Sequence, residues 1–371
     1  MKKFIQEPAY SLKDFRLLPG YTHEECEVRD ISLRSPLCRD KEDFIMLDLP
    51  FLSAAMQSVT SVRLATALAE LGGVGVIPLG NSIEEQCRKV ESVKQYKTGF
   101  PRPTADARNM LRVGAAVSTH PEDRERITEL IKTGVDFIVI DASDGFTIYQ
   151  SSTIEWIKEN HRIPVIGGNV ITDRAFDTLV KAGADAVKVG MGAGSGCITQ
   201  DVKGTGRGQA TAIMEVVKAR DAFAASNRYI PVIADGGISS PADIAIALAL
   251  GADSVMMGNF FARFNESHGR EFEINGKKVK EYWMEGSIKG HNDRRYQHSM
   301  DNFFEEGVSG FVPLEGSIYD LLPISRKRLV STFRSIGAAS MDDFHRLSVL
   351  ELQSSMAQFD GRVHGMVQFD I

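Results

Sequence analysis

The sequence predicts an α/β protein of the (β/α)8 TIM-barrel class, on the evidence of its strand count, its order of elements and its length. Eight short apolar runs rich in Val, Ile, Ala and Gly recur along the chain with helical patterns between them, which is typical of parallel strands joined by crossover helices. Eight strands close a barrel, whereas an open doubly wound sheet usually has fewer. A chain of 371 residues fits one such barrel with insertions.

The predicted strands and helices alternate along the first two thirds of the chain. The strands are expected at residues 51–56, 73–78, 113–118, 137–142, 164–170, 186–191, 231–237 and 254–259. Helices are expected at residues 61–71, 121–132, 172–182 and 240–250. Several of these helices begin at Ser, Thr or Pro and end at Gly, as helix capping predicts.

Three regions stand outside this alternation. Residues 95–110 hold two prolines and little hydrophobic periodicity, so we expect a connector that is too short for a domain. Residues 263–304 contain an Asn-Gly turn between strand-like EFEI and KVKEYW, which predicts a finger or flap insertion made of a hairpin and a mobile loop. Residues 325–371 return to helical periodicity, and we expect them to pack the last helix and a subunit contact. The whole chain, 1–371, is therefore expected to be one catalytic domain.

Composition narrows the class of partner. Hydrophobic residues make up 43% and charged residues 25%, which are ordinary globular values. A net charge of -6 argues against a nucleic-acid binder and favours a small-molecule ligand. The four cysteines form no CxxC pair, no His lies near them at zinc-ligand spacing, and no run of about 18 apolar residues occurs. We expect a reduced, cytoplasmic protein without a membrane span.

Two glycine-rich loops are candidates for a phosphate site. Barrel active sites lie at the carboxyl ends of the strands, with phosphate commonly held after strands seven and eight. Those loops read DGGIS and MGNFF, in which Gly236, Gly237, Gly258 and Asn259 could offer backbone N–H groups to an anion. The alternative is that these glycines only make tight turns.

The loop after the sixth strand, VGMGAGSGCITQ, is the candidate catalytic loop. Gly190, Gly192, Gly194 and Gly196 alternate up to Cys197, so the loop is expected to need left-handed backbone angles or exposed carbonyls. A lone cysteine is often a small buried hydrophobe. A cysteine in a polar loop on the catalytic face could equally form a thiolate and act as a nucleophile. The residues alone leave both readings open.

Other polar residues follow strands four to six. Lys188 invites a rival hypothesis, a Schiff-base lysine, which would leave the DGG and cysteine loops without a role. Its side chain could instead point to solvent or to a ligand phosphate. Asp141, Ser143 and Asn169 lie on the same face and could hold sugar hydroxyls or cap helices.

At GMGAGSGCITQ the sequence resembles the inosine monophosphate (IMP) dehydrogenase and guanosine monophosphate (GMP) reductase superfamily. The segments LSAAMQSVTS, GAAVSTH, IDASDG, VIGGNV, TGRGQATA, ADGGI, VMMG and EEGVSGFVPLEGS and the DI ending follow in the same order. This combination is far more specific than any one motif. The resemblance implies an oxidoreductase of purine biosynthesis that uses NAD and potassium, acts on a purine nucleoside monophosphate and forms a homotetramer.

The resemblance also implies roles for single residues. Cys197 would add to C2 of the purine so that hydride leaves for the nicotinamide, and Thr199, Arg295 and Tyr296 would complete the catalytic set. The nucleotide would be held by Met56, Ser195, Asp235, Gly236, Gly237, Gly258, Asn259, Tyr282, Gly286, Ser287 and Glu306. The dinucleotide would meet Thr119, His120, Asp141, Ser143, Asn169, Lys188, Gly190 and Gly192. The carbonyls of Gly192, Gly194 and Cys197 resemble the potassium site.

Dehydrogenase and reductase differ in the second step of the reaction. The dehydrogenase activates water with an Arg-Tyr pair on its flap, and NDRRYQH supplies Arg295 and Tyr296. We therefore favour IMP dehydrogenase. The alternatives are GMP reductase, because Thr199 and Glu306 occur in both enzymes, a non-catalytic nucleotide-binding paralogue and a flavin-binding barrel. The choice between NAD and NADP stays open.

Three departures from the family pattern are visible. The paired regulatory nucleotide-binding (CBS) domains are absent, because only the short connector occupies their place. Glu285 stands where Met usually lies beside the purine, and Gly208 stands where Pro is usual. The ending VHGMVQFDI lacks the usual polar and glycine pattern, which bears on the partner subunit's share of the cation site.

Overall fold

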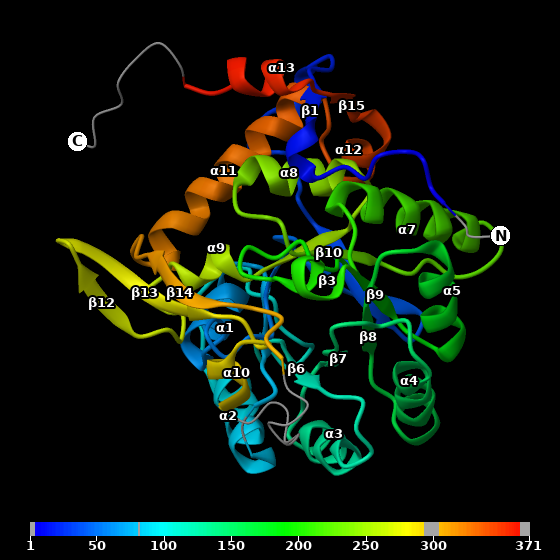
Figure 1. Cartoon of the computed structure of the whole chain (residues 1–371), viewed down its shortest axis with the longest axis vertical. Helices are drawn as coiled ribbons and strands as arrows, with labels where there is room; N and C mark the ends of the chain where they lie inside the picture. Colours follow the sequence, from blue (N-terminus) through cyan, green and yellow to red (C-terminus); the bar gives the residue numbers. More distant parts are fainter. Residues whose placement is uncertain (1–3, 81, 293–303, 364–371) are drawn as a thin grey trace.

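Eight parallel strands close into a barrel in the order β10, β11, β4, β5, β6, β7, β8 and β9, which confirms the predicted fold class (Figure 1). The computed structural model describes residues 4–80, 82–292 and 304–363. The strands are β4 (Phe51–Ser53), β5 (Val74–Ile77), β6 (Val113–Val117), β7 (Phe137–Ile140), β8 (Val165–Val170), β9 (Ala186–Val189), β10 (Val232–Asp235) and β11 (Ser254–Met257). Each lies inside its predicted range, and all except β8 end before that range does, because the last predicted residues belong to the loops that follow the strands.

The four predicted helices are present. They are α1 (Val62–Glu70), α3 (Asp123–Lys132), α5 (Asp173–Ala182) and α8 (Pro241–Ala249). Side-chain caps fix several starts: the hydroxyls of Ser61, Thr172 and Ser240 accept hydrogen bonds from backbone N–H groups three residues on. At the end of α5, Gly183 adopts φ 108°, which suits a glycine C-cap.

Three long helices were not predicted from the sequence. They are α2 (Ile83–Gln95), α4 (Ile148–Asn160) and α7 (Gln209–Ala224). Two short helices were also not predicted: α6 (Thr199–Lys203) precedes α7, and α9 (Asn259–Ala262) follows β11. In α4 the buried face mixes Gln150 and Ser151 with Ile154 and Ile157, so its hydrophobic stripe is weak. Residues 96–112 carry neither a helix nor a strand, as the connector prediction requires.

A hairpin closes the amino end of the barrel. Strands β2 (Ser35–Asp40) and β3 (Asp43–Leu47) pair in antiparallel fashion. Leu37 and Ile45 of this hairpin join the same apolar cluster as Phe137 and Ile233 inside the barrel. The interior is therefore filled at this end, and ligand space remains toward the carboxyl ends of the strands.

The insertion after the eighth strand contains the predicted hairpin. Strands β12 (Glu271–Ile274) and β13 (Lys277–Trp283) flank Asn275 and Gly276, whose φ values of 52° and 74° suit a two-residue turn. A third strand, β14 (Ser309–Pro313), pairs with β13 and extends the sheet beyond the expected 263–304 range. Figure 1 shows this sheet projecting from the barrel on the side of α11. The expected mobile loop falls largely on residues outside the described part of the chain, after α10 (Ile288–Asn292).

The tail is mostly helical, as predicted, in α11 (Ile318–Ile336), α12 (Met341–Leu347) and α13 (Ser355–Asp360). One strand within it was missed: β15 (Val349–Leu352) pairs with β1 (Phe15–Leu18) near the other terminus. Short 3-10 turns lie at Leu12–Asp14 and Glu24–Cys26.

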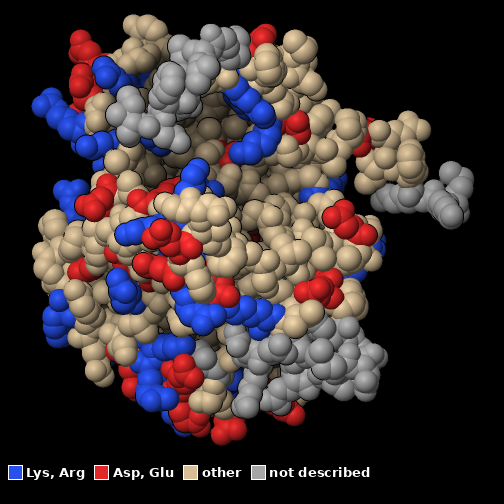
Figure 2. Space-filling model, turned by 60° about the vertical axis from the view of Figure 1, so that its left-hand side comes forward, with Lys and Arg blue, Asp and Glu red and all other residues tan. Residues whose placement is uncertain are grey.

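Surface charge and helix hydropathy can be described for part of the molecule. Figure 2 shows acidic and basic side chains interspersed over one face, without an extended field of one sign there. Among the described residues, no helix combines the length and the apolar character that crossing a bilayer requires.

Candidate active site

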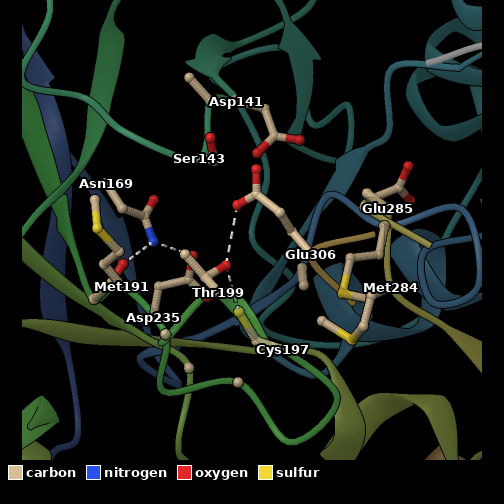
Figure 3. Close-up of a pocket in the computed structure, with 18 of the residues that line it drawn as sticks. Asp141, Ser143, Asn169, Met191, Cys197, Thr199, Asp235, Met284, Glu285 and Glu306 are labelled. Atoms are coloured by element: carbon tan, nitrogen blue, oxygen red, sulfur yellow. Dashed lines mark hydrogen bonds between the residues drawn. The ribbon is translucent and has the colours of Figure 1, made fainter. Parts of the chain in front are cut away.

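A cavity of about 470 Å³ opens at the carboxyl ends of the barrel strands, where the sequence places the chemistry (Figure 3). It collects residues from loops that are far apart in sequence, together with Met284 to Gly286 after β13. The predicted residues that line it are Met56, His120, Asp141, Ser143, Asn169, Lys188, Gly190, Gly192, Gly194, Cys197, Thr199, Asp235, Gly236, Gly286 and Glu306.

Cys197 lies on a loop that is tied to the segment before β14. Its backbone forms a bridge to Gly307, and the N–H of Ile198 donates to the carbonyl of Glu306 at 3.0 Å. The loop begins at Gly190, which has φ 141°, and a Cβ there would collide with the backbone oxygen of Asp235. The expectation of left-handed backbone is thus met at Gly190, and a β-carbon would also push Asp235 away.

The thiol of Cys197 belongs to a short polar chain. Its Sγ lies 3.1 Å from Oγ1 of Thr199, and Thr199 donates to Oε2 of Glu306 at 3.2 Å (Figure 3). The ammonium of Lys203 lies 3.4 Å from Oε1 of the same glutamate. Because Thr199 gives its one proton to Glu306, its oxygen is left to accept a proton from the thiol. The arrangement can move a proton from sulfur toward a carboxylate.

Lys188, Asn169 and Asp235 meet at the base of the cavity. The Lys188 ammonium lies 2.7 Å from Oδ2 of Asp235 and donates to Oδ1 of Asn169 at 2.5 Å. These two acceptors stabilise the charged ammonium, whereas Schiff-base formation requires the neutral amine. The rival lysine chemistry is therefore not favoured here.

Tyr282 lies beside the two loops expected to hold phosphate. Its hydroxyl hydrogen-bonds with Ser195, and burial raises its pKa to about 12. A Cβ added to Gly258 would come within 3.0 Å of the same hydroxyl, so glycine lets the loop after β11 approach Tyr282. Tyr282 is therefore a neutral donor at physiological pH.

The neighbouring loops present backbone rather than side chains. Gly236 and Gly237, directly after β10, have φ values of 91° and 73°. The amide oxygen of Asn259 accepts hydrogen bonds from Arg263 at 2.6 and 3.2 Å, which turns that side chain toward Arg263. Ser287 donates to the carbonyl of Met284 at 2.7 Å and shapes the turn after β13.

Glu285 is held against the loop after β4. Its Oε1 accepts a hydrogen bond from the backbone N–H of Gln57 at 2.5 Å, and the side chain is buried at the cavity wall. The sequence marks this position as unusual, but it does not show the partner, which lies more than two hundred residues away along the chain. Glu285 thereby ties the Met56 loop to the turn after β13.

Sequence reasoning missed a set of apolar lining residues. They are Ala54, Ala55, Ala142, Met191, Ala193, Met256, Met284 and Phe304. For all except Phe304, the position at the ends of predicted strands, or beside the cysteine loop, could have indicated them. Together they offer an apolar surface suited to flat rings.

A second cavity of about 400 Å³ adjoins the first, because His120 lines both. Thr119 also lines it, as do Tyr149 and Trp156 of α4. The Arg124 guanidinium lies 5.1 Å from the centre of the Trp156 ring. The aromatic and polar lining is suited to a second ring system.

Two of the three carbonyls expected at a cation site, those of Gly192 and Gly194, already accept hydrogen bonds within the chain. The Gly192 carbonyl accepts from Nε2 of Gln200 at 2.8 Å, and that of Gly194 accepts from the N–H of Cys197 at 3.1 Å. Each keeps a second lone pair, so neutral oxygen ligands of the right kind are present. No cluster of His, Cys, Asp or Glu suited to a metal ion occurs in the described part of the chain. Arg295 and Tyr296 lie outside the described residues.

Comparison with known proteins identifies the family. A model of the IMP dehydrogenase / GMP reductase domain matches residues 9–364. The chain belongs to this family. It is 30% identical to an inosine-5'-monophosphate dehydrogenase of Tritrichomonas foetus, over all of this chain and 98% of that protein. It is 35% identical to one from Borreliella burgdorferi, over 92% of this chain and 93% of that protein.

Other members of the family are longer. Inosine-5'-monophosphate dehydrogenase 2 of Arabidopsis thaliana is 39% identical over 76% of this chain, which corresponds to 57% of that protein. The Tritrichomonas foetus alignment runs over 496 positions, although this chain has 371 residues. Those relatives therefore contain segments without a counterpart here.

Proposed function

We propose that this protein is an IMP dehydrogenase, which oxidises IMP to xanthosine monophosphate (XMP) with NAD. The contact of Cys197 with Thr199, at 3.1 Å on the wall of the cavity, carries the covalent chemistry that both enzymes of the family share, and the names of the relatives carry the choice of dehydrogenase. The relatives that cover nearly all of this chain are named inosine-5'-monophosphate dehydrogenase. GMP reductase is not favoured.

The nucleotide is held at three points. Asp235 accepts hydrogen bonds from the ribose. Tyr282, Ser195 and the N–H groups of the loops at Gly236 and Gly258 bind the phosphate, with support from the Tyr282–Ser195 contact and from the positive φ at Gly236. The purine meets Met56, Gly286 and Glu306, all of which line the cavity.

The first chemical step is addition and hydride transfer. The Cys197 thiolate adds to C2 of hypoxanthine and forms a C–S bond, while its proton passes through Thr199 toward Glu306. Hydride then leaves C2 for the nicotinamide of NAD, which becomes NADH. A covalent thioimidate between Cys197 and the purine remains.

The second step is hydrolysis. Water adds to C2, the C–S bond breaks, and XMP leaves while the thiol is restored. Arg295 and Tyr296, which lie outside the described residues, activate this water in our proposal. The protons balance because water supplies the new oxygen of XMP, one proton to N3 of the purine and one proton to the sulfur of Cys197.

The dinucleotide extends across the two adjoining cavities. Its nicotinamide half lies near Asp141, Ser143 and Gly190 in the first cavity, next to the purine. Its adenosine half reaches Thr119 and His120, which line the second. The shared His120 supports one continuous binding path.

A monovalent cation, potassium, completes the catalytic loop in our proposal. The carbonyls of Gly192, Gly194 and Cys197 would hold it, and it would order the loop rather than take part in bond making. Support comes from the second lone pair that each of the two glycine carbonyls retains.

We further propose a single-domain homotetramer that works in the cytoplasm without regulatory CBS domains. The lack of helix or strand in residues 96–112 supports the single domain, since this connector occupies the place of the insertion. The free state of all four cysteines is compatible with a reducing compartment.

Absorbance of the reduced cofactor tests the assignment. We expect NADH to form with IMP and NAD, and no NADPH to be consumed with GMP and NADPH. Consumption of NADPH with GMP alone would establish the reductase instead. Inactivity with both pairs, despite nucleotide binding, would establish a non-catalytic paralogue.

A further inference from the structure

Three adjacent strands bring Asn169, Lys188 and Asp235 to one point inside the barrel. Strands β8, β9 and β10 are neighbours, and Lys188 stands opposite Ile233 in the register of β9 with β10. Ile233 faces the barrel interior, and Asp235, two residues further on, faces the same way. Lys188 and Asp235 thus meet because of the barrel's register.

Two of the three hydrogen bonds among these residues converge on one oxygen of Asp235. Oδ2 accepts from the Lys188 ammonium at 2.7 Å and from Nδ2 of Asn169 at 3.0 Å. The same Nδ2 donates to the carbonyl of Gly190 at 2.8 Å. Among the described residues, no side chain or backbone N–H donates to Oδ1 of Asp235. Figure 3 shows Asn169 turned toward Asp235 at the cavity wall.

Lys188 also fixes which way the Asn169 amide points. An ammonium has only protons to offer, so the atom that faces it must be the amide oxygen, as the 2.5 Å contact with Oδ1 shows. The amide N–H2 is then directed at Asp235 and at the Gly190 carbonyl. The Gly190 carbonyl and the Asp235 carboxylate, which only accept, favour the same orientation, so Lys188 is one of three groups that fix it.

Exposure distinguishes Lys188 from Asp235. The Lys188 side chain is 4% exposed, whereas that of Asp235 is 19% exposed. A ligand in the cavity therefore meets the carboxylate more readily than the ammonium. The resemblance assigned Lys188 and Asn169 to the dinucleotide, but their contacts point to Asp235.

We propose that Lys188 is a positioning residue for ribose recognition: directly and through Asn169, it holds Asp235 with Oδ1 free to accept from a ribose hydroxyl of the purine nucleotide. The inference rests on the proposed function, which assigns the ribose to Asp235. If Lys188 acts in this way, discrimination between ribose and deoxyribose nucleotides depends on Lys188, although Lys188 does not itself bind the sugar.

Calorimetric binding of IMP, 2'-deoxy-IMP and 3'-deoxy-IMP, without NAD, tests this. The unsubstituted protein should bind at least one deoxy analogue roughly 10- to 100-fold more weakly than IMP, as expected for a lost hydrogen bond to a charged group. In Lys188→Met the ratio of the affinity for IMP to that for the deoxy analogue should fall to near one. It should fall because IMP binds more weakly, while the affinity for that deoxy analogue changes little. Lys188→Arg should preserve the ratio.

Two further variants make the test specific. Lys132→Met removes a cation on α3 that lines neither cavity, and this variant should keep the affinity ratio of the unsubstituted protein. Asn169→Ala removes one of the two donors to Asp235 and should lower the ratio partly. If Lys188→Met lacks a cooperative thermal transition, Asn169→Ala carries the test.

The outcomes separate the inference from the function on which it rests. A folded Lys188→Met variant that keeps the full ratio, or that changes only the KM for NAD, would overturn the ribose inference and leave the dehydrogenase intact. Failure of the unsubstituted protein to bind IMP would overturn both. An affinity ratio that falls to near one in Lys188→Met and is retained in Lys188→Arg would establish the ribose inference.

Discussion

Thr199 donates a hydrogen bond to Glu306, with 3.2 Å between Oγ1 and Oε2, while the same Oγ1 lies 3.1 Å from Sγ of Cys197. A hydroxyl has one proton to give, so its orientation toward Glu306 leaves lone pairs facing the thiol. The two contacts together form a route by which the nucleophile can lose its proton inside a partly buried loop.

Replacing Thr199 by Val should interrupt this route. Positioned acid–base groups contribute roughly 10²- to 10⁴-fold, and we expect the rate of the first NADH formed to fall by that order near neutral pH. The matched variant Thr199→Ser keeps the hydroxyl and should stay close to the original rate. Stopped-flow absorbance measures both, and an unchanged rate in Thr199→Val would exclude the route.

Replacing Tyr282 by Phe should weaken phosphate binding. Burial raises the pKa of Tyr282 to about 12, so the hydroxyl stays protonated below that pH and can donate throughout the working range. We expect the KM for IMP to rise about tenfold, equivalent to about 1.4 kcal/mol, with kcat little changed. The ratio of the KM of Tyr282→Phe to that of the unsubstituted protein should stay constant from weakly acid to weakly alkaline pH. Tyr96→Phe, at an exposed position, is the control. A fall of this KM ratio to about one at mildly alkaline pH would contradict the claim that Tyr282 is a neutral donor.

Potassium should activate the protein over sodium or lithium. The carbonyls of Gly192 and Gly194 can replace part of the hydration shell of a large, weakly hydrated ion. Steady-state rates in chloride salts of equal ionic strength measure the effect, and we expect several-fold higher kcat in potassium. Equal rates in the three salts would contradict a specific potassium site.

Replacing Arg295 by Ala should separate the two chemical steps. Hydride transfer needs the Cys197 thiolate, whereas hydrolysis needs a group that activates water, so only hydrolysis should slow, by roughly 10²- to 10⁴-fold. Rapid-mixing kinetics should show a burst of NADH close to one per site followed by a very slow steady state. Burst and steady state falling together would mean that Arg295 is not the hydrolytic residue.

The barrel could be predicted from the sequence because its signals are local. The strands are continuous apolar runs. Helices such as α5 are preceded directly by a capping Thr and followed directly by a glycine. The hairpin turn at Asn275 and Gly276 is equally local. The strand β15 was missed because it is stabilised by pairing with β1 at the opposite end of the sequence, and no local pattern records that partner.

The site was predicted less completely for the same reason. The catalytic face and most lining residues follow from strand ends, and the resemblance supplied their roles. The contacts of Glu285 with Gln57 and of Lys188 with Asp235 join residues 228 and 47 positions apart, so they depend on the closed barrel. Sequence spacing could suggest that Lys188 faces a ligand, but it could not show that an aspartate lies in between.

The most direct test of the central claim is a search for the covalent adduct on Cys197. Protein that is turning over IMP and NAD is quenched in acid, digested and examined by mass spectrometry, with Cys197→Ala treated in the same way. We predict a purine nucleotide on the peptide that contains Cys197, no adduct in the alanine variant, and IMP binding but no turnover by that variant. Turnover that persists in Cys197→Ala, or rapid turnover with no adduct on Cys197, would contradict the covalent mechanism.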